Sequence, residues 1–248
     1  MSVKNSTMLR AYPEIGYGGY TRCDGTVAFF ARVNALLAPD AHVLDIGCGR
    51  GACFDDESSP WRNSLRNFKE RARQVTGIDV DEEGRSNPSL DAFHLIEDPR
   101  AWPIESDSID LAVSNYVLEH VENPGSFFSE CHRVLKPGAY VCLQTPNRYS
   151  YVSLFASVIP NRFHAGITSK VQDSRRSDDV FPTFYRCNTK RAVIRYMRKA
   201  GFEVTVLRHE AEPAYLRFSS LAYRLGVLAH RLMPPPLAST LLIYARKR

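Results

Sequence analysis

Short apolar runs alternate with helical patterns along most of this chain, and that alternation restricts the possible fold more than any other feature. Runs that resemble strands occur at residues 42–46, 74–80, 93–96, 109–114, 140–145, 202–207 and 241–245. Alternating strands and helices predict a mostly parallel sheet with helices on its faces. The sequence therefore predicts a single α/β domain spanning residues 1–248, with a seven-stranded, mostly parallel, doubly wound sheet.

Capping residues mark the expected helix starts. Asp24 precedes a helical pattern that carries Val27, Phe30, Ala31 and Asn34 and ends near residue 37. Asn123 and Pro124 open another helix, and Thr189 opens one that Gly201 closes. A helical pattern at residues 61–72 follows a polar stretch, residues 55–60, which we interpret as an inserted loop.

Composition leaves several partner classes open and disfavours others. The net charge of +5 permits an acidic partner but fits a solvated surface better. No pair among the six cysteines has CxxC spacing, so reduced thiols in a cytosol fit best. Residues 1–12 lack the apolar stretch of a signal peptide, and no apolar run of transmembrane length occurs. We therefore expect a cytoplasmic protein.

The stretch Val43-Leu44-Asp45-Ile46-Gly47-Cys48-Gly49-Arg50-Gly51 is the strongest local signal. A buried strand runs into glycines that should open a helix, where bare backbone and free N–H groups can receive a ligand. A tight turn without a ligand is the plain alternative. Gly47, Gly49 and Ala52 would also satisfy a loose dinucleotide fingerprint, so the loop alone does not identify a cofactor.

Three further segments follow at intervals along the chain. Gly77-Ile78-Asp79-Val80 places a carboxylate at the end of the second strand, where it could accept hydrogen bonds from ribose hydroxyls, with Asp81 as the alternative. Glu97-Asp98-Pro99 precedes the fourth strand. Asn115-Tyr116-Val117-Leu118-Glu119-His120-Val121 follows that strand, and Lys136-Pro137-Gly138 forms the next turn.

Taken in order, these segments resemble the motifs of class I S-adenosylmethionine-dependent methyltransferases, in the group typified by ubiquinone and menaquinone biosynthesis. The resemblance covers residues 41–147 and implies the Rossmann-like methyltransferase fold with S-adenosylmethionine as cofactor. It implies that Asp45 places the amino-acid end of the cofactor, Asp79 the ribose and Asp98 the adenine. The other cofactor-binding residues that it implies are Gly47, Cys48, Gly49, Val80, Asn115 and Tyr116. Two positions depart from the pattern, Pro99 and Ala139.

His120 is the one candidate for a catalytic residue, because a neutral imidazole can take a proton from an acceptor hydroxyl. A structural role at a helix start explains it equally well. Some relatives bind a divalent metal through an E-x-x-E-H pattern here, but Tyr116 replaces the first glutamate. Glu119 and His120 alone would hold a hard cation poorly, so we predict no metal.

Three segments are candidates for acceptor binding. Residues 1–38 combine a helix with an aromatic, glycine-rich stretch, including Tyr12, Tyr17 and Tyr20, that could close as a lid. Residues 147–186 form an acceptor-side insertion that is rich in aromatic and basic residues. Residues 214–233 form a helical insertion with a leucine stripe flanked by arginines, at positions 221, 225, 228, 232 and 217, 224, 231. Core or dimer packing would explain the stripe, and so would peripheral contact with a membrane.

The leading hypothesis is in-line methyl transfer to an oxygen of a small molecule, a saccharide or a lipid-linked intermediate. An RNA methyltransferase is the first alternative, but no RNA-binding domain and no Asn-Pro-Pro-Tyr signature occur, so nucleic acid is disfavoured as a partner. Asp45 and the Lys136-Pro137-Gly138 turn speak against a nicotinamide oxidoreductase. A non-catalytic cofactor-binding protein stays open, as do the acceptor, the methylated atom and the oligomeric state.

Overall fold

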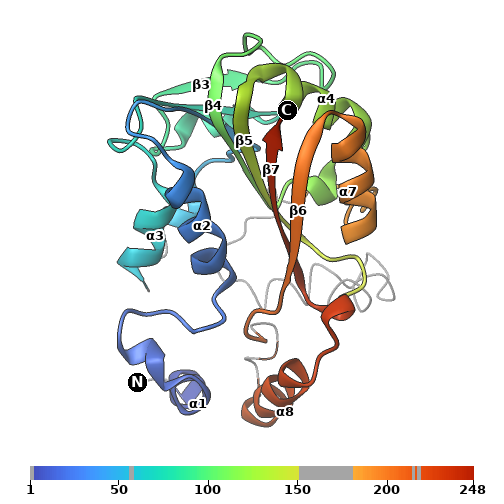
Figure 1. Ribbon diagram of the computed structural model, residues 1–248. Helices are drawn as coiled ribbons and strands as arrows, with labels where there is room; N and C mark the ends of the chain where they lie inside the picture. Colours follow the sequence, from blue (N-terminus) through green and yellow to red (C-terminus); the bar gives the residue numbers. More distant parts are fainter. Residues whose placement is uncertain (1–2, 56–58, 151–180, 214–215, 217–218) are drawn as a thin grey trace.

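The computed structural model describes residues 3–55, 59–150, 181–213, 216 and 219–248, and it contains the predicted seven-stranded sheet (Figure 1). The strand order is β3-β2-β1-β4-β5-β7-β6, and only β7 runs antiparallel to its neighbours. The strands are β1 (His42–Ile46), β2 (Gln74–Asp79), β3 (Ala92–Leu95), β4 (Ile109–Asn115), β5 (Leu135–Pro146), β6 (Phe202–His209) and β7 (Thr240–Lys247). The predicted fold class is confirmed.

Helices cover both faces of the sheet, as a doubly wound fold requires. The described α-helices are α1 (Val3–Ala11), α2 (Gly25–Leu36), α3 (Pro60–Arg66), α4 (Pro124–Val134), α7 (Lys190–Lys199) and α8 (Ser220–Arg231). One apolar core joins the sheet to α2 and α3 around Phe29 and Leu65, and a second joins it to α4 and α7 around Phe128 and Met197. Figure 1 shows the two helix pairs on opposite sides of the strands.

The predicted caps of three helices are confirmed. The Asp24 carboxylate accepts a hydrogen bond from the backbone N–H of Val27, and Asn123 accepts one from the N–H of Ser126. The Thr189 hydroxyl accepts one from the N–H of Ala192. Each cap pairs one of the otherwise unpaired N–H groups of a first helical turn, which is why the sequence located these starts correctly.

Four local expectations are wrong. No α-helix follows the glycine loop directly, because a short 3-10 turn, Ala52–Asp55, comes next and α3 begins only at Pro60. Helix α3 stops at Arg66, well short of residue 72. Strand β5 starts at Leu135 and includes the predicted Lys136-Pro137-Gly138 turn. The buried face of α2 carries Phe29, Phe30 and Val33, whereas Ala31 is exposed.

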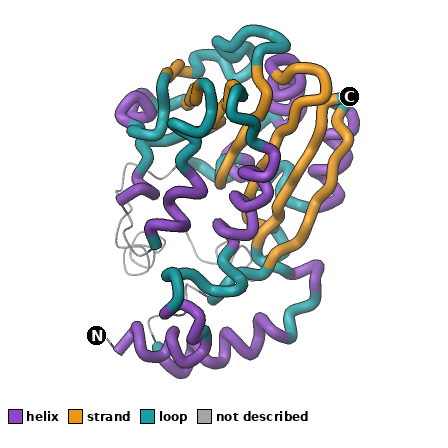
Figure 2. Tube along the Cα trace, turned by 60° about the vertical axis from the view of Figure 1, so that its left-hand side comes forward, coloured by secondary structure: helices purple, strands orange, loops and turns teal. Residues whose placement is uncertain are grey.

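Helices α1 and α8 pack against each other below the sheet, at the end where the parallel strands finish (Figures 1 and 2). Tyr12, Tyr223 and Val227 form a small separate core between them. The N-terminal segment is therefore anchored at Tyr12 rather than free along its whole length. Among the described residues, no helix has both the length and the apolar character needed to cross a membrane.

The strand order places the change of direction between β1 and β4. The chain adds β2 and β3 on one side of β1, then crosses to β4 on the other side. Ligands of doubly wound sheets bind outside the carboxyl ends of the strands at this point. Asp45 lies near the end of β1 and Asn115 at the end of β4, so both predicted site residues stand at the expected edge.

Candidate cofactor site and the acceptor edge

Glycines shape the loop after β1, and two of them have different roles. Gly47 and Gly49 have φ angles of 69° and 52°, which side chains other than glycine rarely adopt. A Cβ on Gly47 would lie 2.3 Å from Cγ2 of Val117, so packing against the segment after β4 requires glycine there. A Cβ on Gly49 would meet nothing within 4 Å. The loop therefore presents bare backbone at Gly49 that a ligand can approach closely.

Two buried polar side chains hold this loop in place. The Asp79 carboxylate accepts hydrogen bonds from the backbone N–H of Gly49 at 2.8 Å and of Asp81 at 3.1 Å. The Asn87 amide donates to the carbonyl oxygens of Cys48 at 2.9 Å and Gly49 at 3.1 Å. Sequence reasoning missed Asn87, although the Asn-Pro pair at this position is a turn signal. A carboxylate can accept about four hydrogen bonds, so Asp79 keeps capacity for ribose hydroxyls, and that role stays a prediction.

Asp45 is half-buried between β2 and β4. Among the described residues, no cation forms an ion pair with it. Burial and the nearby charge of Asp79 raise the pKa of the Asp45 carboxyl to about 7. A carboxylate in this position would gain from any positively charged group that enters the site.

The end of β4 contributes a second unsatisfied group and a strained residue. Oδ1 of Asn115 is buried and has no hydrogen-bond partner among the described residues. Tyr116 has a φ of 58°, and its backbone N–H donates to the carbonyl of Gln144. The Gln144 amide donates to the Tyr116 hydroxyl at 3.1 Å. Buried acceptors are normally paired, and strain of this kind gathers at ligand sites, so the edge at Asn115 is a place for a ligand donor.

The structure thus brings Asp45, Gly47, Gly49 and Asp79 together with the segment after β4. Cys48 is half-buried within the loop, and burial raises the pKa of its thiol. Val80 is exposed directly after Asp79. Asp98 lies in the loop after β3, where the Arg100 guanidinium binds its carboxylate and lowers its pKa. Contact of Asp98 with adenine stays a prediction. To make that contact, the Asp98 carboxylate would have to bind adenine in addition to Arg100, or in its place.

The 3-10 turn Leu118–His120 follows β4 and is fixed by Glu119. The Thr145 hydroxyl donates to the buried Glu119 carboxylate at 3.0 Å. The backbone carbonyl of Glu119 accepts from the N–H groups of Phe184 and Tyr185. Glu119 therefore ties the turn to β5 and to the segment that leads into α7. No group of three metal-ligating side chains occurs among the residues that the structure describes.

His120 is half-buried in the same turn, beside Phe181. Its Nδ1 lies 2.9 Å from the carbonyl oxygen of Pro182. A carbonyl oxygen can only accept, so Nδ1 carries the proton and the neutral ring keeps a lone pair on Nε2. The hydrogen bond to Pro182 gives the His120 ring a fixed orientation, and its catalytic role stays a prediction.

The acceptor-side insertion, residues 147–186, is described only at its two ends. Residues 151–180, with Tyr151, Phe155, Arg162, Phe163, His164, Lys170, Arg175 and Arg176, lie outside the described residues. The ends carry exposed aromatic side chains, at Tyr149, Phe181 and Phe184. All six cysteines lie in the described part and are free thiols, with Cys131 and Cys142 in the core as expected.

Comparisons with known proteins agree with this arrangement. The profile of the methyltransferase domain family matches residues 19–207. A probable S-adenosylmethionine-dependent methyltransferase of Mycolicibacterium smegmatis is 34% identical over 44% of this chain and 39% of its own length. A ubiquinone biosynthesis O-methyltransferase of Pseudomonas aeruginosa is 31% identical over 65% of this chain and 64% of its own length. The match thus spans less than two thirds of either relative.

Among solved structures, an S-adenosylmethionine-dependent methyltransferase of Archaeoglobus fulgidus aligns with a TM-score of 0.55. That alignment covers 89% of this chain and 92% of the other at 19% identity, so it establishes the fold alone. The chain belongs to the methyltransferase domain family, and within it to the Rossmann-like class that the sequence motifs predicted.

Proposed function

We propose that the protein transfers the methyl group of S-adenosylmethionine to an oxygen of a small molecule, a saccharide or a lipid-linked intermediate. The observation that carries this proposal is the Asp45 carboxylate, which has no cationic partner among the described residues, beside the open backbone of Gly49. A ligand with a cationic amino-acid end and a ribose would complete this edge, because it supplies a positive charge for Asp45 and hydroxyl donors for Asp79. The residues present therefore fit S-adenosylmethionine.

The chain's own groups would bind and align rather than react. Asp45 would hold the cofactor's ammonium group, Asp79 its ribose hydroxyls, and Asn115 a further donor. When bound, the cofactor supplies a methyl group on a positively charged sulfur, which is already strongly electrophilic. An acceptor oxygen held in line would take that methyl group, and the electron pair of the carbon–sulfur bond would stay on sulfur. The free Nε2 of His120 would take the proton that the acceptor hydroxyl loses.

The first test measures cofactor binding and methyl transfer in two carboxylate variants. In Asp79→Ala, affinity for S-adenosylmethionine should fall about 10- to 100-fold, because charged hydrogen bonds contribute about 1.5–3 kcal/mol each. Asp81→Ala should change it less than about threefold, because the Asp81 side chain caps the next turn through Glu83 N–H. Calorimetric titration of both variants gives the affinities.

Methyl-labelled cofactor, incubated with the protein and fractionated cell extract, tests turnover in the same variants. Label should enter a small-molecule, saccharide or lipid fraction and disappear with Asp79→Ala. Label in RNA would contradict the proposed acceptor class. Equal binding by wild type and Asp79→Ala, with loss in Asp81→Ala, would move the ribose role to Asp81. Binding without any transfer would support a non-catalytic protein instead.

We propose further that helix α8 contacts an anionic membrane surface. Its other face packs on α1, so the predicted leucine stripe is not part of the core. Leu221, Leu225, Leu228 and Leu232 are 69%, 59%, 55% and 74% exposed. Arg224 and Arg231 are exposed on the same helix, which contains no acidic residue. An exposed apolar stripe with flanking cations suits the surface of an anionic bilayer.

Vesicle flotation tests this contact. The double variant Leu225→Gln/Leu228→Gln should bind vesicles of phosphatidylglycerol and phosphatidylcholine at least about tenfold more weakly, since each leucine that leaves water contributes about 1.5–3 kcal/mol. The control is Leu207→Gln/Leu237→Gln, which changes two leucines outside α8 that are 36% and 39% exposed. If the α8 variant instead converts a dimer to a monomer in size-exclusion chromatography, the stripe is a subunit interface.

A further inference from the structure

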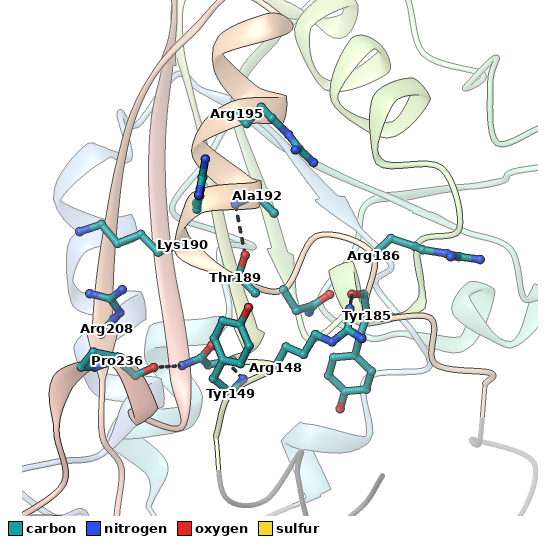
Figure 3. A pocket seen from close by; sticks show the side chains of 13 residues that line it. Arg148, Tyr149, Tyr185, Arg186, Thr189, Lys190, Ala192, Arg195, Arg208 and Pro236 are labelled. Carbon is teal, nitrogen blue, oxygen red and sulfur yellow. Dashed lines mark hydrogen bonds between the residues drawn. The ribbon is translucent and has the colours of Figure 1, made fainter.

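A basic pocket lies at the carboxyl edge of the sheet, beyond β5 and away from the glycine loop. It has a volume of about 510 Å³ and is bounded by the residues after β5, the first turns of α7 and the end of β6 (Figure 3). Six of its lining side chains are cationic, namely Arg148, Arg186, Lys190, Arg191, Arg195 and Arg208. None of its lining residues is acidic. The pocket thus concentrates positive charge in one concave place.

These cations have no carboxylate partners in the part of the chain that the structure describes. Elsewhere in the same structure many basic residues do, for example Arg133 with Glu130 and Lys247 with Asp107. Figure 3 shows Lys190 and Arg208 on one side of the pocket and Arg186 on the other. Like charges that line one pocket without a counter-ion raise its positive potential, so an anionic ligand would be attracted to it.

The start of α7 adds to this positive potential. Thr189 caps the helix, and its first turn contains Lys190 and Arg191 but no acidic residue. Helix N-termini carry a partial positive charge and favour anions, whereas cations are normally placed at the other end. Helix α7 therefore carries basic residues at its N-terminus, where acidic residues are usual, and this end of the helix faces the pocket.

An unpaired buried acceptor in the lining points independently to a ligand. Asn188 is 1% exposed, and its amide N–H₂ donates to the Thr145 hydroxyl at 2.6 Å. Its Oδ1 is buried and has no partner among the described residues. A buried acceptor of this kind costs free energy unless a donor reaches it. A ligand hydroxyl would supply that donor, which the phosphate group alone would not.

Aromatic side chains complete the lining. Tyr149 is 55% exposed, and Tyr185 has a φ of 50°, a conformation that is rare outside glycine. Figure 3 shows both rings at the lower side of the pocket. Tyr149 is exposed and Tyr185 half-buried, and tyrosine rings offer flat apolar faces and hydroxyl groups to a sugar or a base. The lining therefore combines cations for phosphate, an acceptor for a hydroxyl and aromatic faces for a ring.

A chain of hydrogen bonds joins this pocket to the segment after β4. Asn188 donates to Thr145, and Thr145 donates to Glu119, which stands next to His120. The carbonyl of Glu119 accepts from Tyr185 N–H, so a lining residue of the pocket is bound directly to that segment. A molecule that extends from the pocket toward His120 would bridge the two places.

We infer that this pocket binds a phosphate or diphosphate group of the methyl acceptor, which is therefore a phosphorylated polyol or a sugar attached to diphosphate. The identification of the ligand as the methyl acceptor rests on the proposed methyl transfer. The anion site itself is supported independently, by the residues that line the pocket. Such an acceptor must come from a reaction that attaches a phosphate or diphosphate to a sugar. Its anionic end binds the cations, a ring hydroxyl donates to Asn188, and another hydroxyl extends toward His120.

Binding of two probes, inorganic pyrophosphate and uridine diphosphate, tests the site without any methyl transfer. Both should bind the wild-type protein, with the nucleotide tighter because it also contacts the tyrosines. The double variant Arg195→Gln/Arg208→Gln should weaken both at least about tenfold, while S-adenosylmethionine binding stays unchanged. Both arginines are exposed, so neither change threatens the fold.

The matched control is Arg198→Gln/Lys199→Gln, which removes the same charge from exposed positions on α7 outside the pocket. It should leave probe binding within about twofold of wild type. Equal loss in both double variants, or no probe binding at 10 mM (roughly the ceiling for a specific site), would overturn the inference. So would tight binding of a polyuridine RNA that the pocket variant abolishes, if pyrophosphate fails to compete with it.

The methyl-labelled product from cell extract separates this inference from the proposed function. A labelled product that loses its anion-exchange retention after phosphatase or pyrophosphatase treatment supports both. A labelled product without phosphate overturns the pocket's role in acceptor binding and leaves methyl transfer intact. Pyrophosphate binding by a protein that binds no S-adenosylmethionine would overturn the proposed function and leave the anion site intact.

Discussion

Gly49→Ala is expected to weaken S-adenosylmethionine binding by about 100-fold or more while the protein stays folded. The new Cβ would meet no protein atom within 4 Å, so it would instead fill the space over the loop. The φ of 52° at this residue costs a side chain about 1–2 kcal/mol. For a chain of this size, that corresponds to a fall in the melting temperature of roughly 2–8 °C.

Gly47→Ala should show the opposite balance. Its Cβ would lie 2.3 Å from Val117 Cγ2, so the loop or the segment after β4 must move. Overpacking and the left-handed backbone together should cost about 3 kcal/mol or more, with a fall of roughly 6–12 °C in the melting temperature. Gly16→Ala is the matched control, because that residue has neither a positive φ nor an atom within 4 Å of the new Cβ.

Thermal melts and calorimetric titration of the three variants separate folding from binding. The pattern that supports the site is a large loss of affinity in Gly49→Ala with a small loss of stability. If Gly49→Ala binds S-adenosylmethionine within about threefold of wild type, the cofactor does not lie against that backbone. If Gly47→Ala is as stable as Gly16→Ala, the close packing on Val117 does not limit this position.

The sequence predicts the strands well because each is a short apolar run bounded by turn residues, and seven such runs allow few arrangements. It predicts helix starts where a side chain caps the first turn, as at Asp24, Asn123 and Thr189. It fails after the glycine loop, where the 3-10 turn Ala52–Asp55 stands in place of the expected helix. Local propensity cannot report the contacts of the loop itself, since Asn87 binds the carbonyls of Cys48 and Gly49 from a distant segment.

For the site residues too, the sequence predicts what local pattern determines and misses what tertiary contacts determine. The motif order placed Asp45, Gly47, Gly49 and Asp79 at one edge, because parallel strands end there. The sequence could not reveal that Asp98 pairs with Arg100, because short polar loops adopt many conformations. Nor could it reveal the basic pocket, whose cations are Arg148, Arg186, Arg208 and three residues of α7, and whose walls meet through the pairing of β5, β6 and β7.

Asp45 links cofactor binding to pH and to stability, with a definite sign. Burial and the charge of Asp79 raise the pKa of Asp45 to about 7 in the folded protein, whereas an unfolded aspartate has a pKa of about 3.9. Between these values the folded state holds a proton that the unfolded state has lost. The stability of the cofactor-free protein should therefore fall as pH rises from about 4 to about 7, by about 1–3 kcal/mol after screening of a half-buried group.

Asp45→Asn removes that titration and should give opposite effects on folding and on binding. At pH 8 the cofactor-free variant should be more stable than wild type by about 1–3 kcal/mol, and at pH 5 the difference should shrink to about a third of that. Its affinity for S-adenosylmethionine should be about 100-fold lower at pH 8, because the charged partner of the ammonium group is lost. Wild-type affinity should rise by up to about tenfold for each unit that the pH increases towards 7, because only the ionised Asp45 pairs with the ammonium group, whereas the affinity of the variant should not change with pH.

Asp110→Asn is the control, because its carboxylate is perturbed in the other direction. Although burial opposes it, the hydrogen bond from His42 N–H and the Lys136 ammonium group hold the pKa of Asp110 below its usual range. Its loss should destabilise the protein at pH 8 and leave cofactor affinity unchanged. Urea unfolding at pH 5 and pH 8 measures both signs. An Asp45→Asn protein that binds S-adenosylmethionine as tightly as wild type would show that the carboxylate does not face the cofactor. A variant that is less stable than wild type at pH 8 would show that the protein itself stabilises the charged Asp45 carboxylate in the absence of the cofactor.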